Sequence, residues 1–242
     1  MAQYVYGKNV VIQMLKNKSD ILQLYVLDGN KDDELGKLIK NSGVSVKMTS
    51  RKELDKVAGT SKHQGVVAKI KEYKTYSIEE IVKSIPEGKM PLLLMLDGLE
   101  DPHNLGAILR TSDCVGVDGV IVGKNRSISL TPTVAKISTG AIDTVKVAMV
   151  TNLTQTLKDL KKQGYWVFGT DMENASDYRQ VDYNTPMVLV IGSEGFGISR
   201  LVKQECDYCI SLPMVGKISS LNASVATAVL LYQIYSQRFP VK

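Results

Sequence analysis

The hydrophobic pattern divides the chain into two parts. Up to about residue 70, short apolar runs alternate with segments in which apolar residues recur three or four positions apart. Helices are therefore expected at 7–17, 32–43 and from 51, and strands at 21–29, 44–50 and 64–70. Ser50 and Glu53 have the spacing of a capping box, which would start the third helix at Arg51. This part is predicted to be a small α/β domain.

From residue 91 the apolar runs become nearly continuous. Strands are expected at 91–98, 119–122, 145–150, 165–170, 187–193 and 209–214, with helical segments between them. A strand that is buried on both faces needs no polar alternation, so this pattern predicts a parallel sheet covered by helices on both faces. The second part is therefore predicted to be a doubly wound α/β domain.

Two further segments complete the organisation. Residues 75–90 are polar and contain Pro86 and Gly88, as expected of a linker, with a short helix after Ser77 because Glu80 repeats the capping-box spacing. The last helix, 221–239, is apolar on most sides. It must therefore be buried in the core or against a second copy of the chain.

Charge is concentrated at the beginning of the chain. Residues 1–75 hold 14 Lys and Arg against 8 Asp and Glu, a net charge of +6, whereas the remainder has a net charge of −1. A basic domain beside a nearly neutral one favours binding to a polyanion such as RNA, although a lysine-rich solvated surface explains the charge equally well. No apolar run approaches the roughly 20 residues of a membrane span, and the first ten residues lack a signal-peptide core. We expect a cytoplasmic protein without a membrane partner.

The three cysteines are Cys114, Cys206 and Cys209. An odd number without export signals argues against a disulfide framework. Cys206 and Cys209 form a C-x-x-C pair, but zinc would need a second pair. We expect ordinary thiols and no metal.

Ligands of a parallel sheet bind at the carboxyl ends of its strands. Three stretches there are rich in Gly, Asn, Ser and charged residues: LDGLEDPHNLGAILR (96–110), VIGSEGFGISR (190–200) and LPMVGKISSLNASVATA (212–228). None has the glycine spacing of a dinucleotide-binding or P-loop fingerprint.

Taken in this order, the three stretches resemble motifs 1, 2 and 3 of the SpoU (TrmH-type) RNA ribose 2′-O-methyltransferases of the SPOUT superfamily. The resemblance covers nearly the whole chain: 1–74 is similar to the family's L30e-like substrate-binding domain, 75–90 is the linker, and 91–242 is similar to the catalytic domain. It implies a deep trefoil knot, a homodimer, and S-adenosylmethionine as methyl donor. The sequences of motifs 1 and 3 are most similar to those of the 23S ribosomal RNA guanosine 2′-O-methyltransferases.

The resemblance also implies a set of site residues. The catalytic positions fall on Asn104, Arg110, Glu194, Ser220 and Asn222, and the positions whose backbone surrounds the methyl donor fall on Gly192, Leu212 and Leu221. Ser220 and Asn222 could also cap the last helix, and the two roles are compatible.

A ribose hydroxyl is a poor nucleophile and needs help in losing its proton. Arg110 is the base proposed for such enzymes, but a guanidinium keeps its proton in nearly any protein setting. We therefore expect Arg110 to bind a phosphate or to stabilise the developing alkoxide, close to Asn104 at the same strand end. Gly192 and Gly195 are expected to let backbone approach a nucleoside closely.

Some interpretations stay open at this point. His103 is a general base by type or a plain loop residue, His63 contacts RNA or solvent, and Arg126 contacts a phosphate or lies in a solvated loop. A transfer-RNA ribose methyltransferase would share the catalytic residues. An RNA-binding factor without turnover and a nicotinamide-dependent oxidoreductase are the alternatives from other classes.

Overall fold

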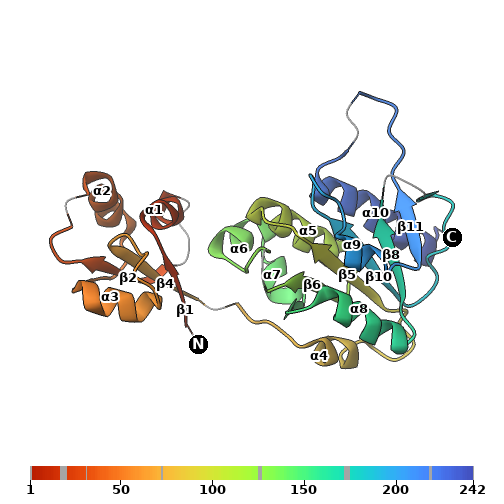
Figure 1. Ribbon diagram of the computed structural model, residues 1–242, viewed down its shortest axis with the longest axis horizontal. Coiled ribbons are helices and arrows are strands. Elements are labelled where there is room, and N and C mark those ends of the chain that lie inside the picture. Colours follow the sequence, from red (N-terminus) through yellow and green to blue (C-terminus); the bar gives the residue numbers. More distant parts are fainter. Residues whose placement is uncertain are drawn as a thin grey trace. The chain divides into compact units, whose positions relative to one another are not determined.

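The computed structural model describes residues 2–16, 21–30, 32–71, 73–124, 127–171, 175–217 and 220–241. The chain divides into two compact units, Met1–Tyr73 and Lys74–Lys242 (Figure 1). Arg126, for which we considered a phosphate contact, lies outside the described residues.

The first unit is an α/β domain with a mixed sheet. Its strands β1 (Ala2–Tyr6), β2 (Ile21–Leu27), β3 (Val46–Thr49) and β4 (Val66–Lys71) lie in the order β1-β4-β2-β3, and only β2 and β3 are parallel. Helices α1 (Lys8–Lys16) and α2 (Asp33–Ser42) pack with one apolar cluster, while α3 (Arg51–Ala58) packs through Leu54 with Tyr25 and Val67. The predicted α/β class is confirmed, and β1 is an additional strand.

Helix α3 begins at Arg51, as predicted. The Ser50 side chain accepts a hydrogen bond from the Glu53 amide at 3.4 Å. The Glu53 carboxylate does not close the capping box, because it binds Lys47 and Thr49 on β3 instead. Ser50 therefore caps α3 alone.

The second unit is built on a parallel sheet. Its strands lie in the order β7-β6-β5-β10-β8-β11-β9, and every described pairing between neighbours is parallel. The strands are β5 (Leu92–Asp97), β6 (Gly119–Gly123), β7 (Val147–Val150), β8 (Trp166–Thr170), β9 (Ser176–Asp177), β10 (Met187–Gly192) and β11 (Tyr208–Ser211). The predicted doubly wound sheet is confirmed; its predicted knot stays a prediction.

Helices cover both faces of this sheet (Figure 1). One face carries α5 (Pro102–Val115), α6 (Pro132–Ser138), α7 (Ala141–Thr144) and α10 (Ala223–Arg238). The other carries α4 (Ile78–Lys83), α8 (Leu153–Lys162) and α9 (Arg200–Lys203), whose buried residues share one apolar cluster.

Helix α4 lies in the segment predicted as a linker. Its capping box is confirmed, because Ser77 accepts from the Glu80 amide at 3.1 Å and Glu80 accepts from the Ser77 amide at 2.7 Å. The fully buried Ile81 packs on Gly119 of β6, where a Cβ atom would lie 2.6 Å from its methyl group. This segment is thus packed on the second unit.

Hydrogen bonds from Arg238 hold the C-terminal end of helix α10 in place. The Arg238 guanidinium donates to carbonyl oxygens of Met90, Pro91, Tyr183 and Thr185, at 2.6–3.3 Å. Burial lowers the pKa of this guanidinium. None of the described helices is long and apolar enough to cross a membrane.

Candidate active site

A hydrogen-bonded cluster joins three loops at the carboxyl edge of the sheet. The Asn104 amide nitrogen donates to Glu194 Oε1 at 3.1 Å, and the Asn222 amide nitrogen donates to the same oxygen at 2.6 Å and to Asn104 Oδ1 at 3.0 Å. The Ala223 backbone N–H also donates to Glu194 Oε1, at 3.1 Å. The predicted meeting of the three loops is confirmed for these residues.

The local sequence explains why Asn222 takes this place. Its Oδ1 accepts from the amides of Ser224 (3.0 Å) and Val225 (3.4 Å) and from the Ser224 hydroxyl (2.6 Å), so Asn222 is the N-cap of α10. With Oδ1 committed to the helix, the amide nitrogen faces Glu194 and Asn104. The capping role and the position in the cluster are therefore compatible, as predicted.

Glu194 is well matched to this position. A carboxylate is favoured at a helix N-terminus, and three N–H donors converge on its Oε1. Its Oε2 accepts no hydrogen bond from the part of the chain that is described, and the side chain is exposed. One carboxylate oxygen thus fixes the loop while the other stays accessible.

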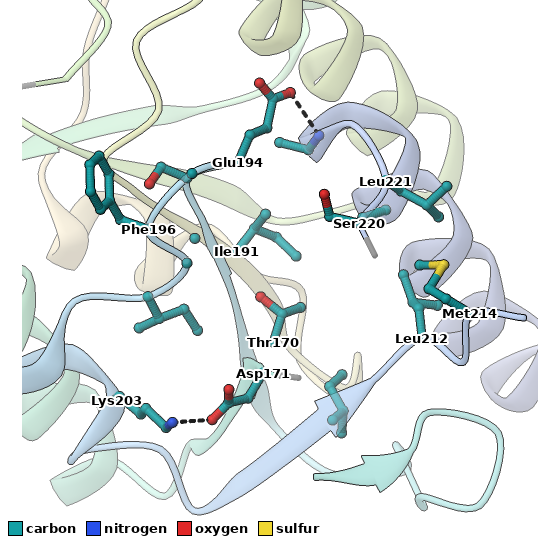
Figure 2. Close-up of a pocket in the computed structure, with 18 residues that line it drawn as sticks. Thr170, Asp171, Ile191, Glu194, Phe196, Lys203, Leu212, Met214, Ser220 and Leu221 are labelled. Atoms are coloured by element: carbon teal, nitrogen blue, oxygen red, sulfur yellow. Dashed lines mark hydrogen bonds and ion pairs between the residues drawn. The ribbon is translucent and has the colours of Figure 1, made fainter. Parts of the chain in front are cut away.

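A cavity of about 460 Å³ lies beside the cluster (Figure 2). It opens at the carboxyl ends of the neighbouring strands β8, β10 and β11 and at the start of α10. Glu194 and the positions predicted to surround the methyl donor, Gly192, Leu212 and Leu221, all line it, and so does Ser220. Figure 2 shows Leu212, Met214 and Leu221 on one side of this cavity and Phe196 on the other.

Gly192 is required for a reason different from the one expected. A Cβ atom there would lie 2.1 Å from the carbonyl carbon of Gly197 and 2.3 Å from the amide nitrogen of Ile198. The loop folds back closely over the end of its own strand. The absence of a side chain at Gly192 therefore makes room for the backbone of Gly197 and Ile198. Gly195 has open space around it, which leaves room for a ligand.

Arg110 stands apart from the cluster. It is exposed on α5, and its side chain makes no hydrogen bond or ion pair with the described residues. Six residues along a helix place two side chains about 120° apart around its axis, so Arg110 and Asn104 lie on different sides of α5. The structure thus brings Asn104, Glu194 and Asn222 together and leaves Arg110 outside their hydrogen bonds.

The two histidines lie in different environments. His103 is exposed in the first turn of α5, outside the cavity lining. His63 is 2% exposed, accepts from the Gly65 amide at 3.0 Å through Nδ1, and lies 3.1 Å from Asp55 Oδ1 through Nε2. Both interpretations of His63, an RNA contact and solvent exposure, were wrong, because the ring is buried between these two partners.

The sequence interpretation missed several cavity residues. Thr170 is the last residue of β8 and Asp171 follows it, and Asp171 forms an ion pair with Lys203 of α9 that is drawn in Figure 2. Polar residues directly after a predicted strand were the available signal. No feature of the sequence pointed to Lys203, because α9 comes close to the cavity only once the sheet has folded.

Metal binding has no support in the described residues, where no group of three or more His, Cys, Asp or Glu side chains is placed to hold an ion. The three cysteines are free thiols. Burial raises the pKa of Cys206 to about 12, so this thiol keeps its proton.

Two family models match the chain. The SpoU rRNA Methylase family matches residues 91–232, and the model described as RNA 2′-O ribose methyltransferase substrate binding matches residues 4–76. The putative TrmH family tRNA/rRNA methyltransferase YacO of Bacillus subtilis (strain 168) is 46% identical, over 98% of this chain and 97% of its own length. A putative TrmH family tRNA/rRNA methyltransferase of Staphylococcus haemolyticus (strain JCSC1435) is 43% identical over 98% and 96%.

Solved structures share the fold. The SpoU methyltransferase AviRb from Streptomyces viridochromogenes, in complex with the cofactor AdoMet, superposes with a TM-score of 0.65 at 23% identity, covering 99% of this chain and 92% of its own. The A. aeolicus TrmH/SpoU tRNA modifying enzyme has a TM-score of 0.57 at 32% identity, covering 66% and 81%. The family models and the relatives show one class, the RNA methyltransferases, and the fold agrees with it. The chain belongs to the SpoU family of these enzymes.

Proposed function

We propose that this protein transfers the methyl group of S-adenosylmethionine to a ribose 2′-hydroxyl of RNA. The observation that carries the proposal is the Asn104–Glu194–Asn222 cluster beside a cavity lined by Gly192 and Leu212. A volume of about 460 Å³ is within the range of small-ligand sites. Its lining combines apolar side chains for an adenine with polar groups for a ribose and an amino acid.

S-adenosylmethionine, when bound, supplies an electrophilic methyl group. The protein's own contribution is to hold the ribose oxygen in line with that group. Glu194 Oε2, which has no partner among the described residues, is available to accept the hydrogen bond of a 2′-hydroxyl. Asn104 and Asn222 keep the carboxylate in one orientation, so the accepting oxygen is already in place before RNA arrives.

Arg110 takes an electrostatic role in this proposal. Its exposed guanidinium is available to a phosphate of the RNA, or to the developing negative charge on the ribose oxygen once RNA has moved close. Ser220, exposed at the cavity rim, is available to the same ribose or to the donor.

The first domain is proposed to bind the RNA. Its net charge of +6 supports attraction to phosphates, and its match to a substrate-binding model supports the assignment. We propose 23S ribosomal RNA as substrate, with a guanosine as target, in the cytoplasm. Transfer RNA is the second candidate, because the names of the Bacillus and Staphylococcus relatives include both RNA classes.

A homodimer is proposed through α10. Helix α10 leaves Val225 and Tyr232, seven residues apart, 47% and 52% exposed, and Phe239, the C-cap that follows the helix, is 59% exposed. Residues seven apart lie on one side of a helix, so they form an apolar strip that a second copy would cover. Light scattering of the purified protein tests this: a monomeric mass at micromolar concentration contradicts the dimer.

Two measurements test the function. Isothermal titration should detect S-adenosylmethionine and S-adenosylhomocysteine but not NAD; NAD binding alone would support the oxidoreductase alternative. Methyl transfer is then measured on 23S rRNA and tRNA from a strain that lacks the gene, followed by mapping of ribose methylation. Transfer to tRNA alone would replace 23S rRNA as substrate, and cofactor binding without any transfer would favour a non-catalytic RNA-binding factor.

A further inference from the structure

Phe196 is the most conspicuous apolar side chain near the cavity. It lines the cavity, yet 95% of its surface is exposed. Single exposed apolar residues are common and by themselves indicate no function. The position of this ring, rather than its exposure, makes it informative.

The turn that carries Phe196 is fixed at both ends. Ser193 and Gly197 exchange backbone hydrogen bonds of 3.1 and 2.8 Å, which close the turn. Glu194 is held by the cluster on one side, and on the other the Ser199 amide donates to Asp97 Oδ2 at 2.7 Å. The turn therefore presents its ring at a defined place.

Nothing in the described protein covers the ring. Its neighbours Gly195 and Gly197 carry no side chain, and a Cβ at either position would meet no atom within 4 Å. The ring also makes no aromatic or cation contact with the described residues. A flat apolar surface thus stands open at the cavity rim, opposite Leu212 and Leu221 (Figure 2).

We infer that Phe196 is a stacking platform for the base of the target nucleotide. This inference rests on the proposed function. Glu194 and Phe196 are two residues apart, so their Cα atoms are at most about 7 Å apart. The base is joined to the ribose by a single glycosidic bond. A ribose that contacts Glu194 therefore places its base within reach of the Phe196 ring. RNA-modifying proteins read unpaired bases by stacking them on aromatic side chains.

The role is one of positioning, because the ring has no group that could take part in methyl transfer. Stacking does not depend on a hydrogen-bond pattern, so Phe196 orients the nucleotide without selecting the base by itself. Loss of the ring should weaken RNA binding and leave the donor site intact.

The test compares Phe196→Ala, Phe196→Leu and Phe196→Tyr with the unaltered enzyme. Transfer from S-adenosylmethionine is measured at varied concentrations of 23S rRNA and of total tRNA, both from a strain lacking the gene. Phe196→Ala and Phe196→Leu should raise the KM for RNA about 5- to 100-fold. Phe196→Tyr, which keeps the ring, should restore it, and titration should give the same S-adenosylmethionine affinity for all four proteins.

Each contrary result has a distinct meaning. An unchanged KM in Phe196→Ala, with active unaltered enzyme, overturns the platform and leaves the proposed function standing. Weakened S-adenosylmethionine binding overturns it as well, since the ring would then contact the donor. A change from dimer to monomer in light scattering assigns the ring to a subunit contact instead. If the unaltered enzyme transfers no methyl group to either RNA, the proposed function fails and the platform fails with it.

Discussion

The side chains of Asn222 and Glu194 share a 2.6 Å hydrogen bond, although 28 residues separate them in the chain. Asn222 also caps α10, and the first amide of that helix donates to Glu194. The start of the last helix and the orientation of the carboxylate are therefore set by the same contacts. Formation of α10 and completion of the site are expected to be coupled.

This coupling predicts the effect of Asn222→Asp. Aspartate keeps the capping oxygen but removes both N–H donors and places a second carboxylate beside Glu194. The variant should lose about 1–3 kcal/mol of unfolding free energy and nearly all methyl transfer. Denaturation followed by the fluorescence of Trp166, the only tryptophan, reports on the second domain.

Asn152 offers a matched control. It caps α8 by accepting from the Gln155 amide at 2.9 Å and does not line the cavity. Asn152→Asp should leave stability within about 0.5 kcal/mol, since both residues are good N-caps. Equal losses in the two variants would contradict the special role of the Asn222 amide.

Arg110→Ala should separate catalysis from folding. The side chain is exposed and makes no hydrogen bond with the described residues, so the melting temperature and S-adenosylmethionine affinity should not change. Methyl transfer should be lost, with a drop of about 100-fold or more if the guanidinium stabilises developing charge. Lys162→Ala on α8, which removes a surface ion pair with Asp159, is the control and should keep its activity. Unchanged turnover of Arg110→Ala would reject the role.

Gly106 is expected to be essential for packing. It lies in α5, and a Cβ atom there would be 2.6 Å from the Cβ of Ile137 on α6. Gly106→Ala should therefore destabilise the second domain by about 1–3 kcal/mol, despite the better helix propensity of alanine.

Gly36 is the control for Gly106, because the space around it is open. It lies in α2, and a Cβ atom added there would meet no other atom within 4 Å, so Gly36→Ala should stabilise the first domain by about 0.4–1 kcal/mol. Calorimetry can follow the unfolding of both domains. A gain in stability for Gly106→Ala would show that α5 and α6 can separate at little cost.

The cysteines should differ in reactivity. Because burial raises the pKa of Cys206 to about 12, native protein at pH 8 should react with a disulfide reagent first at the exposed Cys114. Cys114→Ser should remove the fast phase, and Cys206→Ser should leave it. Fast modification that survives Cys114→Ser would contradict the protection expected of the half-buried Cys206 and Cys209.

The same thiol gives a pH dependence with a definite sign. The pKa of Cys206 is higher in the folded protein than its ordinary value of 9.0. Its contribution to stability is therefore complete below pH 9 and is lost as pH rises from 9 toward 12. Cys206→Ala should lose less stability than the unaltered protein over that interval, and parallel curves would contradict this.

The sequence predicted correctly the features that depend on residues close together in the chain. The Ser77 capping box, the cap at Asn222 and the apolar runs of the second domain depend on residues within a few positions, and the structure has them as predicted. Strand β1 was missed because Ala2–Tyr6 owes its extended form to antiparallel pairing with β4, more than 60 residues away. His63 was misread although its partners Gly65 and Asp55 are only two and eight residues away, because no periodicity or cap signal in this segment records the burial of the ring.

By itself, the sequence determined most of the strands and helices, though not β1 and β9, and which loops carry the polar residues, because periodicity and caps record how a segment is buried. Only the tertiary structure decided that β10 lies between β5 and β8, which brings Asn104, Glu194 and Asn222 within hydrogen-bonding distance and leaves Arg110 outside their contacts. The physical reason is that a buried strand has the same apolar pattern whichever strand lies beside it. The pairing is selected by the packing of the whole domain.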